Sequence, residues 1–269
     1  MRSLVSLLAL SLAACGPVSP ASERSIHPTI VSLNPCTDAI LAEVADQDQI
    51  LAVSHYSHNP AATSMDLDIA RQFAATGGTV EEVLALNPDV VVAGDFLPPA
   101  TRQALSDLGI RVETFGIASS LEASYARIER LSALAGHQSK GAGLIERIER
   151  ALDDTAGTGR PIGAVLWQPA GIVPGEAVLV SELMRHTGFV SHSAERGMGQ
   201  ADYLSLEQML ADPPEVLLLA GQERSQQHPA LGLLSDTALA HFDSSLLYCG
   251  GPTIVRAAER LAEIREAQS

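Results

Sequence analysis

Short apolar runs alternate with amphipathic segments along the first half of the chain, beginning at residue 29. Four runs have the length and composition of strands, and they lie at residues 29–33, 50–54, 89–93 and 111–115. Helical patterns lie between them at residues 38–45, 79–86 and 98–108. Strands that alternate with helices in this way predict an α/β fold with a mostly parallel, covered sheet.

The middle of the chain changes to two long helical patterns at residues 120–135 and 138–154. In the second pattern, Leu144, Ile148 and Leu152 form an apolar stripe. Because a long helix between two strand-rich halves is typical of a domain connector, we expect two Rossmann-like lobes joined by one helix. The expected division is an N-terminal lobe at residues 27–136, a connector helix at residues 137–158 and a C-terminal lobe at residues 159–269.

The second half repeats the alternation of strands and helices. Its strand patterns lie at residues 163–167, 216–220 and 245–249, and its helical patterns lie at residues 178–187, 206–210 and 253–267. Residues 80–93 and 206–220 resemble each other, since both contain a short acidic helix, a proline stop and a buried strand. Such internal similarity indicates pseudo-symmetric lobes, with chance similarity between two α/β units as the alternative.

The N-terminus has the layout of a secretory signal. Arg2 precedes a short apolar run at residues 4–12, which is too short to span a bilayer. The sequence LAAC at residues 12–15 resembles the lipobox of bacterial lipoproteins. It predicts a lipoprotein signal peptide at residues 1–15 that ends at a lipidated Cys15, followed by a flexible linker at residues 16–26. An ordinary signal with an incidental cysteine is the alternative.

Export would place the two remaining cysteines, Cys36 and Cys249, in an oxidising compartment that favours a disulfide bond. Because these cysteines lie near the two ends of the mature chain, a bridge would tie the start of the fold to its end. Two buried free thiols are the alternative. A metal-binding pair is disfavoured because the chain has no Cys-x-x-Cys spacing.

Composition narrows the class of protein. Of the 269 residues, 46% are hydrophobic and only 18% are charged, which predicts a sizeable core and little disorder. The net charge of −15 argues against a nucleic-acid partner, because the phosphate backbone requires a basic face. The chain lacks a Gly-x-Ser-x-Gly elbow, a Walker loop and a His-Glu-x-x-His motif, so these sequence patterns do not favour an enzyme.

Four stretches carry a resemblance to a known family. They are IVSLNPCTD at residues 30–38, VSHYS at residues 53–57, EEVLALNPDVVVA at residues 81–93 and GGP at residues 250–252. Over residues 27–269 the chain is similar to the periplasmic binding proteins of ABC importers for vitamin B12, ferric siderophores and haem. The resemblance implies a ligand cleft between the lobes, a corrinoid or iron-chelate cargo and delivery to an ABC permease. We further expect no catalysis, no cofactor, a periplasmic monomer and membrane attachment only through the lipid anchor.

The resemblance also implies one surface glutamate in each lobe that docks on permease arginines. By position these are Glu81 and Glu207, and the internal similarity places the two residues equivalently. The alternative is that both are solvated residues at helix starts, where the helix dipole favours an acidic side chain.

The expected ligand site lies where strands end at the cleft, because loops after parallel strands line such sites. The candidate ligand-binding residues are Asn34, Tyr56, Phe96, Trp167 and Tyr203, with Cys36, Asp95, Gln168 and Gly250 in the same loops. The four aromatic side chains offer flat apolar faces to a macrocycle, and Tyr56 matches a cleft tyrosine of the vitamin B12 branch of the family. Core packing is the competing account for each aromatic residue.

His55 and His58 flank Tyr56 and suggest a different chemistry. An imidazole ligand to cargo iron or cobalt is one interpretation, although histidines in a loop are more often polar surface, and we expect no resident metal. With His228 and Asp95 they also suggest a metal-dependent periplasmic hydrolase as the alternative function. Arg71 and Arg196 are candidates for pairing with carboxylates or phosphates of a ligand.

Overall fold

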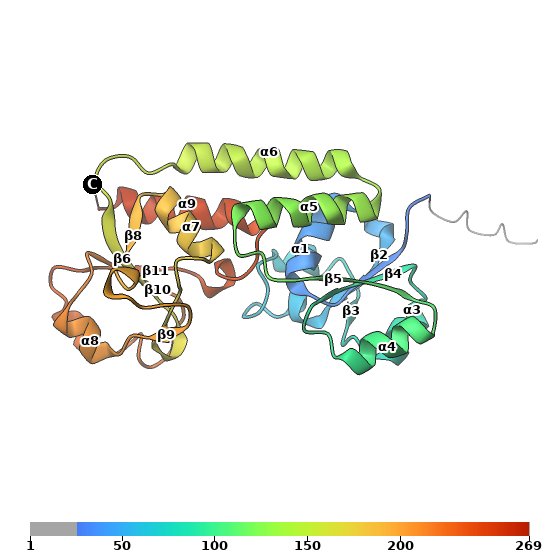
Figure 1. The fold of residues 1–269 in the computed structure, drawn as a ribbon, viewed down its shortest axis with the longest axis horizontal. Coiled ribbons are helices and arrows are strands. Elements are labelled where there is room, and N and C mark those ends of the chain that lie inside the picture. Colours follow the sequence, from blue (N-terminus) through green and yellow to red (C-terminus); the bar gives the residue numbers. More distant parts are fainter. Residues whose placement is uncertain (1–25, 269) are drawn as a thin grey trace, which may run out of the picture.

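Two parallel β-sheets form the centres of two lobes in the computed structural model, which describes residues 26–268 (Figure 1). From edge to edge, the N-terminal sheet contains β3 (Ala75–Thr76), β2 (Ile50–Ser54), β1 (Ile30–Ser32), β4 (Val90–Gly94) and β5 (Arg111–Phe115). The C-terminal sheet contains β11 (Ala238–His241), β10 (Val216–Leu219), β6 (Ile162–Trp167) and β8 (Phe189–Ser191). The expected α/β fold with mostly parallel sheets is confirmed. The expected signal peptide, Cys15 and the linker up to residue 25 lie outside the described residues.

Helices cover both sheets. Those of the N-terminal half are α1 (Pro35–Val44), α2 (Leu67–Ala70), α3 (Val80–Leu86), α4 (Pro99–Asp107) and α5 (Leu121–Ala135). They are followed by α6 (Gln138–Thr155), α7 (Leu179–His186), α8 (Leu206–Ala211) and α9 (Thr253–Glu266). A small antiparallel sheet of β7 (Ile172–Val173) and β9 (Asp202–Tyr203) completes the C-terminal lobe.

The central strands of the N-terminal sheet are buried, as their continuous apolar sequence predicts. Ile30 and Val31 of β1 and Val91 and Val92 of β4 have no exposed surface. The four strands expected in the first half of the chain are all present, and each lies within one residue of its expected bounds. Apolar runs rich in β-branched residues therefore predicted these four strands correctly.

The two main sheets share one pattern of connections. In each, the first strand (β1 or β6) lies between the second strand (β2 or β8) and a later strand (β4 or β10). That later strand also pairs with an edge strand, β5 or β11. The short helices α3 and α8 directly precede β4 and β10. The internal similarity of the sequence thus corresponds to equivalent structural units.

One expected strand, at residues 245–249, is wrong. Ser244–Leu246 forms a 3-10 helix (η6) because the Asp243 side chain accepts a hydrogen bond from the Ser245 backbone N–H and closes a turn. The position beside β10 is occupied by β11 instead. Leu247 is only 7% exposed, so this buried turn has the apolar composition of a strand.

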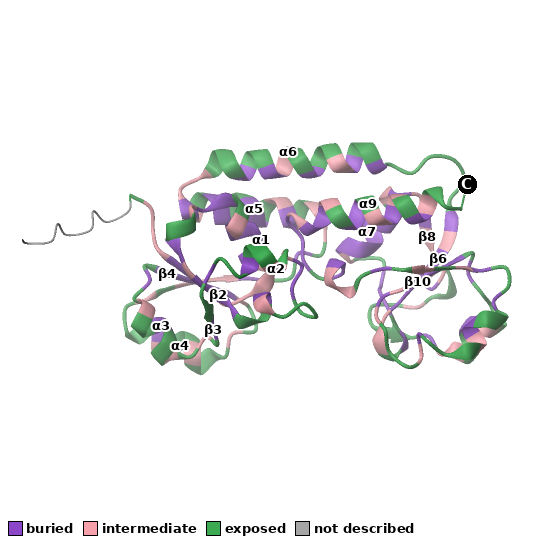
Figure 2. Cartoon of the chain, turned by 180° about the vertical axis from the view of Figure 1, so that it is seen from behind, coloured by how far each residue is buried: buried purple, intermediate pink, exposed green. Residues whose placement is uncertain are grey.

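One hydrophobic cluster contains residues of both lobes and joins them. Helix α6 lies along one side of the molecule and packs on both α5 and α9 (Figure 1). Its residues Leu144, Ile148 and Leu152 belong to the same core cluster as Ile40 of α1 and Leu261 of α9. The outer side of α6 is exposed (Figure 2). The lobes are therefore connected by packing as well as by the chain.

The segment after Cys249 returns to the N-terminal lobe through a position that only glycine fits. The Gly251 N–H donates to Ser124 Oγ at 2.7 Å. A Cβ at Gly250 would lie 2.5 Å from that oxygen, and a Cβ at Gly251 would lie 2.5 Å from Ile40 Cγ1. Gly251 also has a φ of +66°, which disfavours residues with a side chain.

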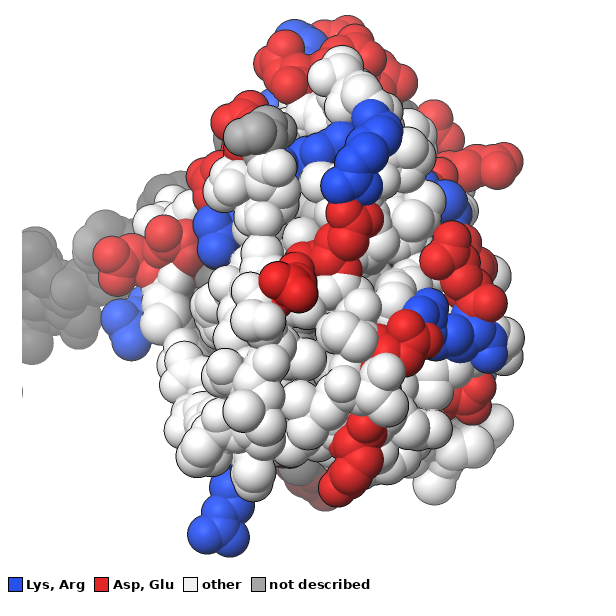
Figure 3. All heavy atoms as spheres, turned by 90° about the vertical axis from the view of Figure 1, so that its left-hand side faces the viewer, with Lys and Arg blue, Asp and Glu red and all other residues white. Residues whose placement is uncertain are grey.

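The surface at the end formed by the C-terminal lobe has no extended basic area. Figure 3 shows Lys and Arg side chains scattered among acidic and uncharged residues on this face. This distribution agrees with the net charge of −15 and does not suit a phosphate backbone. Within residues 26–268, no helix has the length and apolar character needed to cross a membrane.

Candidate functional site

A hollow of about 740 Å³ lies at the carboxyl ends of β1 and β4. It brings together three of the candidate ligand-binding residues, Asn34, Tyr56 and Phe96, with the candidate docking residue Glu81. Leu33 and Leu97 add apolar surface to its wall. All of its lining residues come from the N-terminal lobe. Because loops after parallel strands meet at one edge of a sheet, residues distant in sequence become neighbours here.

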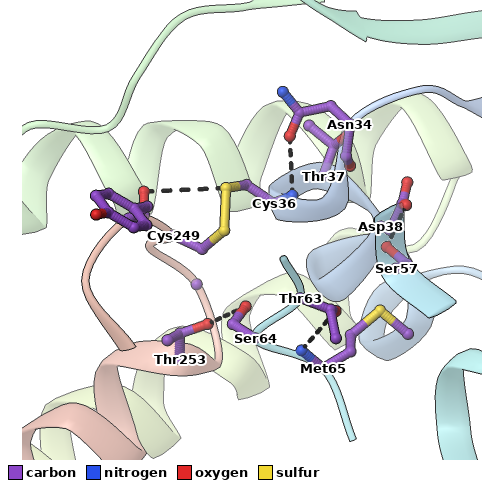
Figure 4. The surroundings of a disulfide bond; sticks show 12 residues. Asn34, Cys36, Thr37, Asp38, Ser57, Thr63, Ser64, Met65, Cys249 and Thr253 are labelled. Atoms are coloured by element: carbon purple, nitrogen blue, oxygen red, sulfur yellow. Dashed lines mark hydrogen bonds between the residues drawn. A yellow bond between two sulfur atoms is a disulfide. The ribbon is translucent and has the colours of Figure 1, made fainter. Parts of the chain in front are cut away.

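Asn34 is fixed by the helix that follows it. It is the N-cap of α1, and its Oδ1 accepts a hydrogen bond from the Cys36 N–H at 2.8 Å (Figure 4). Its Nδ2 lies over Gly94, where a Cβ would approach to 2.7 Å. The absence of a side chain at Gly94 therefore lets the Asn34 amide lie at the end of β4.

Tyr56 lies on a 3-10 helix, η2 (His55–His58). The side chain of the buried Asp38 holds this helix in place by hydrogen bonds. The Asp38 Oδ2 accepts hydrogen bonds from the Ser54 N–H at 2.9 Å and from the Ser57 hydroxyl at 2.6 Å. Both bonds hold the turn that presents Tyr56, whose side chain is 51% exposed. Burial raises the pKa of Asp38 to about 7, although hydrogen bonds from the neighbouring serines act in the opposite direction.

Phe96 points away from the core because the chain turns directly after β4. The Leu97 N–H donates to the Gly94 carbonyl at 3.0 Å and closes this turn. Phe96 is 83% exposed, which is unusual for a large apolar side chain. An exposed ring beside an apolar hollow is typical of a ligand-binding surface.

The structure corrects the expectation for Trp167. Its side chain is 1% exposed and packs with Val165 and Leu217 in the core of the C-terminal lobe. Its Nε1–H donates to the Leu204 carbonyl at 2.9 Å, which satisfies the polar end of the buried ring. Trp167 therefore presents no face to a ligand in this structure. Tyr203, the other aromatic candidate of this lobe, is 62% exposed on β9.

Tyr248 is an exposed aromatic residue that sequence reasoning missed. It is 61% exposed, and its hydroxyl donates to Gln168 Oε1 at 3.1 Å. It directly precedes Cys249, whose disulfide bond with Cys36 lies at the first turn of α1 (Figure 4). Its position next to a cysteine was the available signal, but the strand expected at residues 245–249 concealed it.

Cys36 and Cys249 form the expected disulfide bond, with their Cα atoms 5.0 Å apart. The bond joins the first turn of α1 to the segment that leads into α9 (Figure 4). Close to it, the Thr253 hydroxyl donates to Ser64 Oγ at 2.8 Å, a buried contact between the start of α9 and the N-terminal lobe. Covalent and polar contacts therefore fix the start of α9 to the N-terminal lobe.

Glu81 and Glu207 occupy equivalent positions on the two short helices. Each is the second residue of its helix, two residues after a side-chain cap at Thr79 or Ser205. Both glutamates are exposed. Their helices, α3 and α8, lie on the side of the molecule opposite to α6 (Figure 1). Hydrogen bonds from its own backbone N–H and from Ser205 hold the pKa of Glu207 below its usual value, so it is ionised at neutral pH.

The candidate histidines all contact backbone groups of the protein. His55 Nδ1 lies 3.3 Å from the Thr76 carbonyl, and His58 Nε2 lies 3.0 Å from the Ala70 carbonyl. Nδ1 of His228 accepts the N–H of Ala230 in the other lobe. Within residues 26–268, no three His, Cys, Asp or Glu side chains are placed to hold a metal ion. The described part of the chain thus offers no metal centre for the hydrolase alternative.

The two arginine candidates pair with acidic residues of the protein. Arg71 directly follows α2 and lies 3.6 Å from Asp68 of that helix. Arg196 forms an ion pair with Asp212 and donates to the His192 carbonyl at 2.8 Å. Neither lines the hollow that contains Tyr56. The hollow therefore combines aromatic and apolar surface with one amide and a carboxylate at its edge, which suits binding of a flat ligand.

The chain matches the model of a family described as periplasmic binding protein over residues 30–244. Among curated protein sequences, none matches this chain. The periplasmic haem-binding protein RhuT from Roseiflexus sp. RS-1, in its apo form, is 21% identical, with a TM-score of 0.69 over 90% of this chain and 97% of that chain.

Two structures from Vibrio cholerae share the fold. The periplasmic vitamin B12-binding protein BtuF is 20% identical, with a TM-score of 0.67 over 89% of this chain and 96% of that chain. The periplasmic haem-binding protein HutB is 17% identical, with a TM-score of 0.72 over 88% and 98% of the two chains. At these identities the structural likeness shows the fold alone.

Proposed function

The chain belongs to the periplasmic binding protein family, and from that premise we propose that it captures a flat macrocyclic or chelated metal cargo for an ABC importer. The proposed cargo is a corrinoid, a haem or a ferric siderophore, and the protein delivers it without chemical change. The observation that carries this proposal is the hollow that brings Asn34, Tyr56 and Phe96 together beside Glu81. The vitamin B12-binding and haem-binding names of the structural relatives support the cargo class.

The proposed contact surface is aromatic on both lobes. Tyr56 and Phe96 face the cargo from the N-terminal lobe, and Tyr203 and Tyr248 face it from the C-terminal lobe. All four side chains are at least half exposed, so binding would bury large apolar rings at a low cost in side-chain entropy. Trp167 has no part in this surface because it lies in the core.

A titration with defined probes tests the cargo class. Haemin, cyanocobalamin and a ferric hydroxamate siderophore are added separately to the purified protein, and binding is followed by absorbance of the probe. Tryptophan quenching is a poor readout here because Trp167 is buried. We expect one probe to bind saturably, and Tyr56→Ala or Phe96→Ala to weaken its binding by about tenfold.

Leu233→Ala is the control for this titration, because Leu233 is 75% exposed but lies outside the hollow. It should leave affinity unchanged. Absence of saturable binding by all three probes would exclude the proposed cargo. Equal effects of the Leu233 and Tyr56 variants would show that the hollow is not the site.

We also propose that Glu81 and Glu207 dock on a positively charged surface of the permease. Glu81→Arg or Glu207→Arg should strongly reduce uptake while the purified variants retain affinity for the probe. Glu122→Arg is a matched control, because Glu122 is also the second residue of a helix with a serine cap but lies on α5, away from α3 and α8 (Figure 1). Normal uptake with both docking variants would refute this role.

Attachment through a lipid on Cys15 is the last part of the proposal. It rests on the LAAC sequence at residues 12–15. Cys15→Ser should release the protein from the membrane fraction into the periplasmic fraction. Membrane association that persists in this variant would contradict the proposed anchor.

A further inference from the structure

The N-terminal docking helix is joined to the wall of the hollow by a side chain that has no counterpart in the C-terminal lobe. Glu82 is the third residue of α3, directly after Glu81. Its Oε2 accepts hydrogen bonds from the Thr76 hydroxyl at 2.7 Å and from the Gly78 N–H at 3.0 Å. The bond from Thr76 is the largest factor that lowers the pKa of Glu82, so the carboxylate is ionised and the bond is charge-assisted.

Thr76 connects this carboxylate to the turn that presents Tyr56. It lies on β3, in register with Ser54 at the end of β2. Its carbonyl lies 3.3 Å from His55 Nδ1. The rings of His55 and Tyr56 are in contact, with centroids 4.1 Å apart. Contacts between neighbouring residues therefore run without interruption from the exposed tyrosine to the first turn of α3.

The equivalent position in the C-terminal lobe makes a different contact. Gln208 is the third residue of α8, and its Oε1 accepts the backbone N–H of Ser205 at 2.9 Å. Together with the bond from the Gln208 N–H to Ser205 Oγ at 3.2 Å, this closes a capping box within the helix itself. In the N-terminal lobe Thr79 also caps its helix, but the Glu82 side chain reaches out to Thr76.

We infer that Glu82 is a positioning residue that couples the Tyr56 turn to the docking helix α3, an inference that rests on the proposed docking role of Glu81. A change in the Tyr56 turn on cargo binding is transmitted through Thr76 and Glu82 to the backbone that carries Glu81. By reciprocity, a permease that moves α3 changes the affinity for cargo. Among residues 26–268, only the N-terminal docking surface has this side-chain link, because Gln208 caps α8 within the helix itself.

Two variants break the link at Thr76 and Glu82, which do not themselves line the hollow but both accept the N–H of Gly78, which does. Thr76→Val removes the hydroxyl from a buried residue and keeps its shape. Glu82→Ala removes the acceptor. Glu82→Gln is the conservative variant, because both hydrogen bonds go to a single oxygen that glutamine retains. Gln208→Ala is the matched control at the equivalent position of α8.

Amide hydrogen exchange of the full-length, cargo-free protein decides the inference. Thr76→Val and Glu82→Ala should accelerate exchange several-fold both at residues 76–82 and at residues 55–58. Glu82→Gln should restore protection in both segments, and Gln208→Ala should accelerate exchange only around α8. Acceleration confined to residues 76–82, with residues 55–58 unchanged, would overturn the inference.

Uptake separates this inference from the proposed function. With whichever of haemin, cyanocobalamin or the ferric hydroxamate siderophore saturates the wild-type protein, Thr76→Val should support less uptake at a probe concentration that saturates both proteins. Glu82→Gln should support normal uptake. Normal uptake with Thr76→Val would also overturn the inference. If none of the three probes binds the wild-type protein, the proposed cargo is wrong, and the exchange measurement on cargo-free protein still decides the coupling.

Discussion

Asp38 is a buried residue that holds in place the turn carrying Tyr56. It is fully buried, its Oδ2 holds the turn at Ser54 and Ser57, and its Oδ1 has no hydrogen-bond partner. A buried carboxylate with one unpaired oxygen is costly to ionise. Protonation of this oxygen relieves that cost without breaking the two bonds to Oδ2, which explains the raised pKa.

The stability of the protein should therefore depend on the protonation of Asp38. The pKa of Asp38 is about 7 in the folded protein and near 3.8 in an ordinary environment. Between these values the folded state binds more protons than the unfolded chain, so the free energy of unfolding falls as pH rises through this window. We expect urea unfolding to give lower stability at about pH 8 than at about pH 5, by up to about 3 kcal/mol.

Asp38→Asn should flatten this part of the pH profile, whereas Asp48→Asn, at an exposed position, should leave it unchanged. Glu215 acts in the opposite direction, because Arg160 lowers its pKa to about 2. Its effect belongs to acid conditions below its ordinary pKa of 4.5, outside the range from pH 5 to pH 8 that tests Asp38. The same slope in the wild type and in Asp38→Asn would contradict the assignment.

Among the candidate ligand-binding residues, exposure to solvent was predictable where a residue directly follows the end of a strand. Tyr56 and Phe96 come after β2 and β4, where the backbone must leave the sheet, so exposure was predictable. Trp167 is the last residue of β6 itself. The face to which a strand side chain points depends on neighbours that sequence does not reveal. Tyr248 follows the turn at Ser244–Leu246, where the sequence pattern predicted a strand, so its exposure was not anticipated.

At the scale of elements, the segment at Gly250 and Gly251 explains why α9 can lie against both halves of the molecule. This segment passes between Ser124 of α5 and Ile40 of α1, where no Cβ has room. The GGP sequence at residues 250–252 was recognisable as a family feature. Its physical reason, a close backbone approach between helices, required the structure.

A pair of glycine substitutions should have opposite effects on stability. Gly251→Ala adds a Cβ at 2.5 Å from the buried Ile40 at a residue with φ of +66°, so the free energy of unfolding should fall by roughly 2–4 kcal/mol. Gly143→Ala adds a Cβ to open space within α6 and should raise it by about 0.5–1 kcal/mol. Chemical denaturation measures both. Equal stability of the wild type and Gly251→Ala would refute the steric argument.

The elements that sequence missed are short or at an edge. β11 has the sequence ALAH, alternates partly buried with exposed residues and lies at the edge of its sheet. Its weak pattern gave no signal, while the buried turn at Ser244–Leu246 resembled a strand. Long segments such as α5 and α6 were located to within a residue or so at each end, because their apolar stripe repeats over several turns.

At the scale of the whole molecule, the Cys36–Cys249 bond closes a loop that contains most of the fold. The two residues are 213 positions apart, so the bond strongly restricts the unfolded chain. A variant with both Cys36→Ser and Cys249→Ser should lose about 5 kcal/mol in the free energy of unfolding, in the chain-entropy model. Urea unfolding measures this loss.

A reducing agent provides the control for the disulfide prediction. It should lower the stability of the wild-type protein to that of the double serine variant and leave the variant unchanged. Equal stability of oxidised wild type and double variant would show that the bond contributes little. The shared core around α6, which has no such covalent dependence, should keep both lobes folded in either case.

The position of α9 also sets an order of events for a chain that emerges from a ribosome or a secretion channel with its N-terminus first. Ile254, Leu261 and Ile264 of α9 belong to the core cluster that includes Leu144 and Ile148 of α6. Until the final turns of the chain have emerged, the part of the α6 stripe that packs on α9 faces water. A nascent chain stalled before residue 253 therefore presents both halves incomplete at once, so export must deliver the whole sequence before either half is finished.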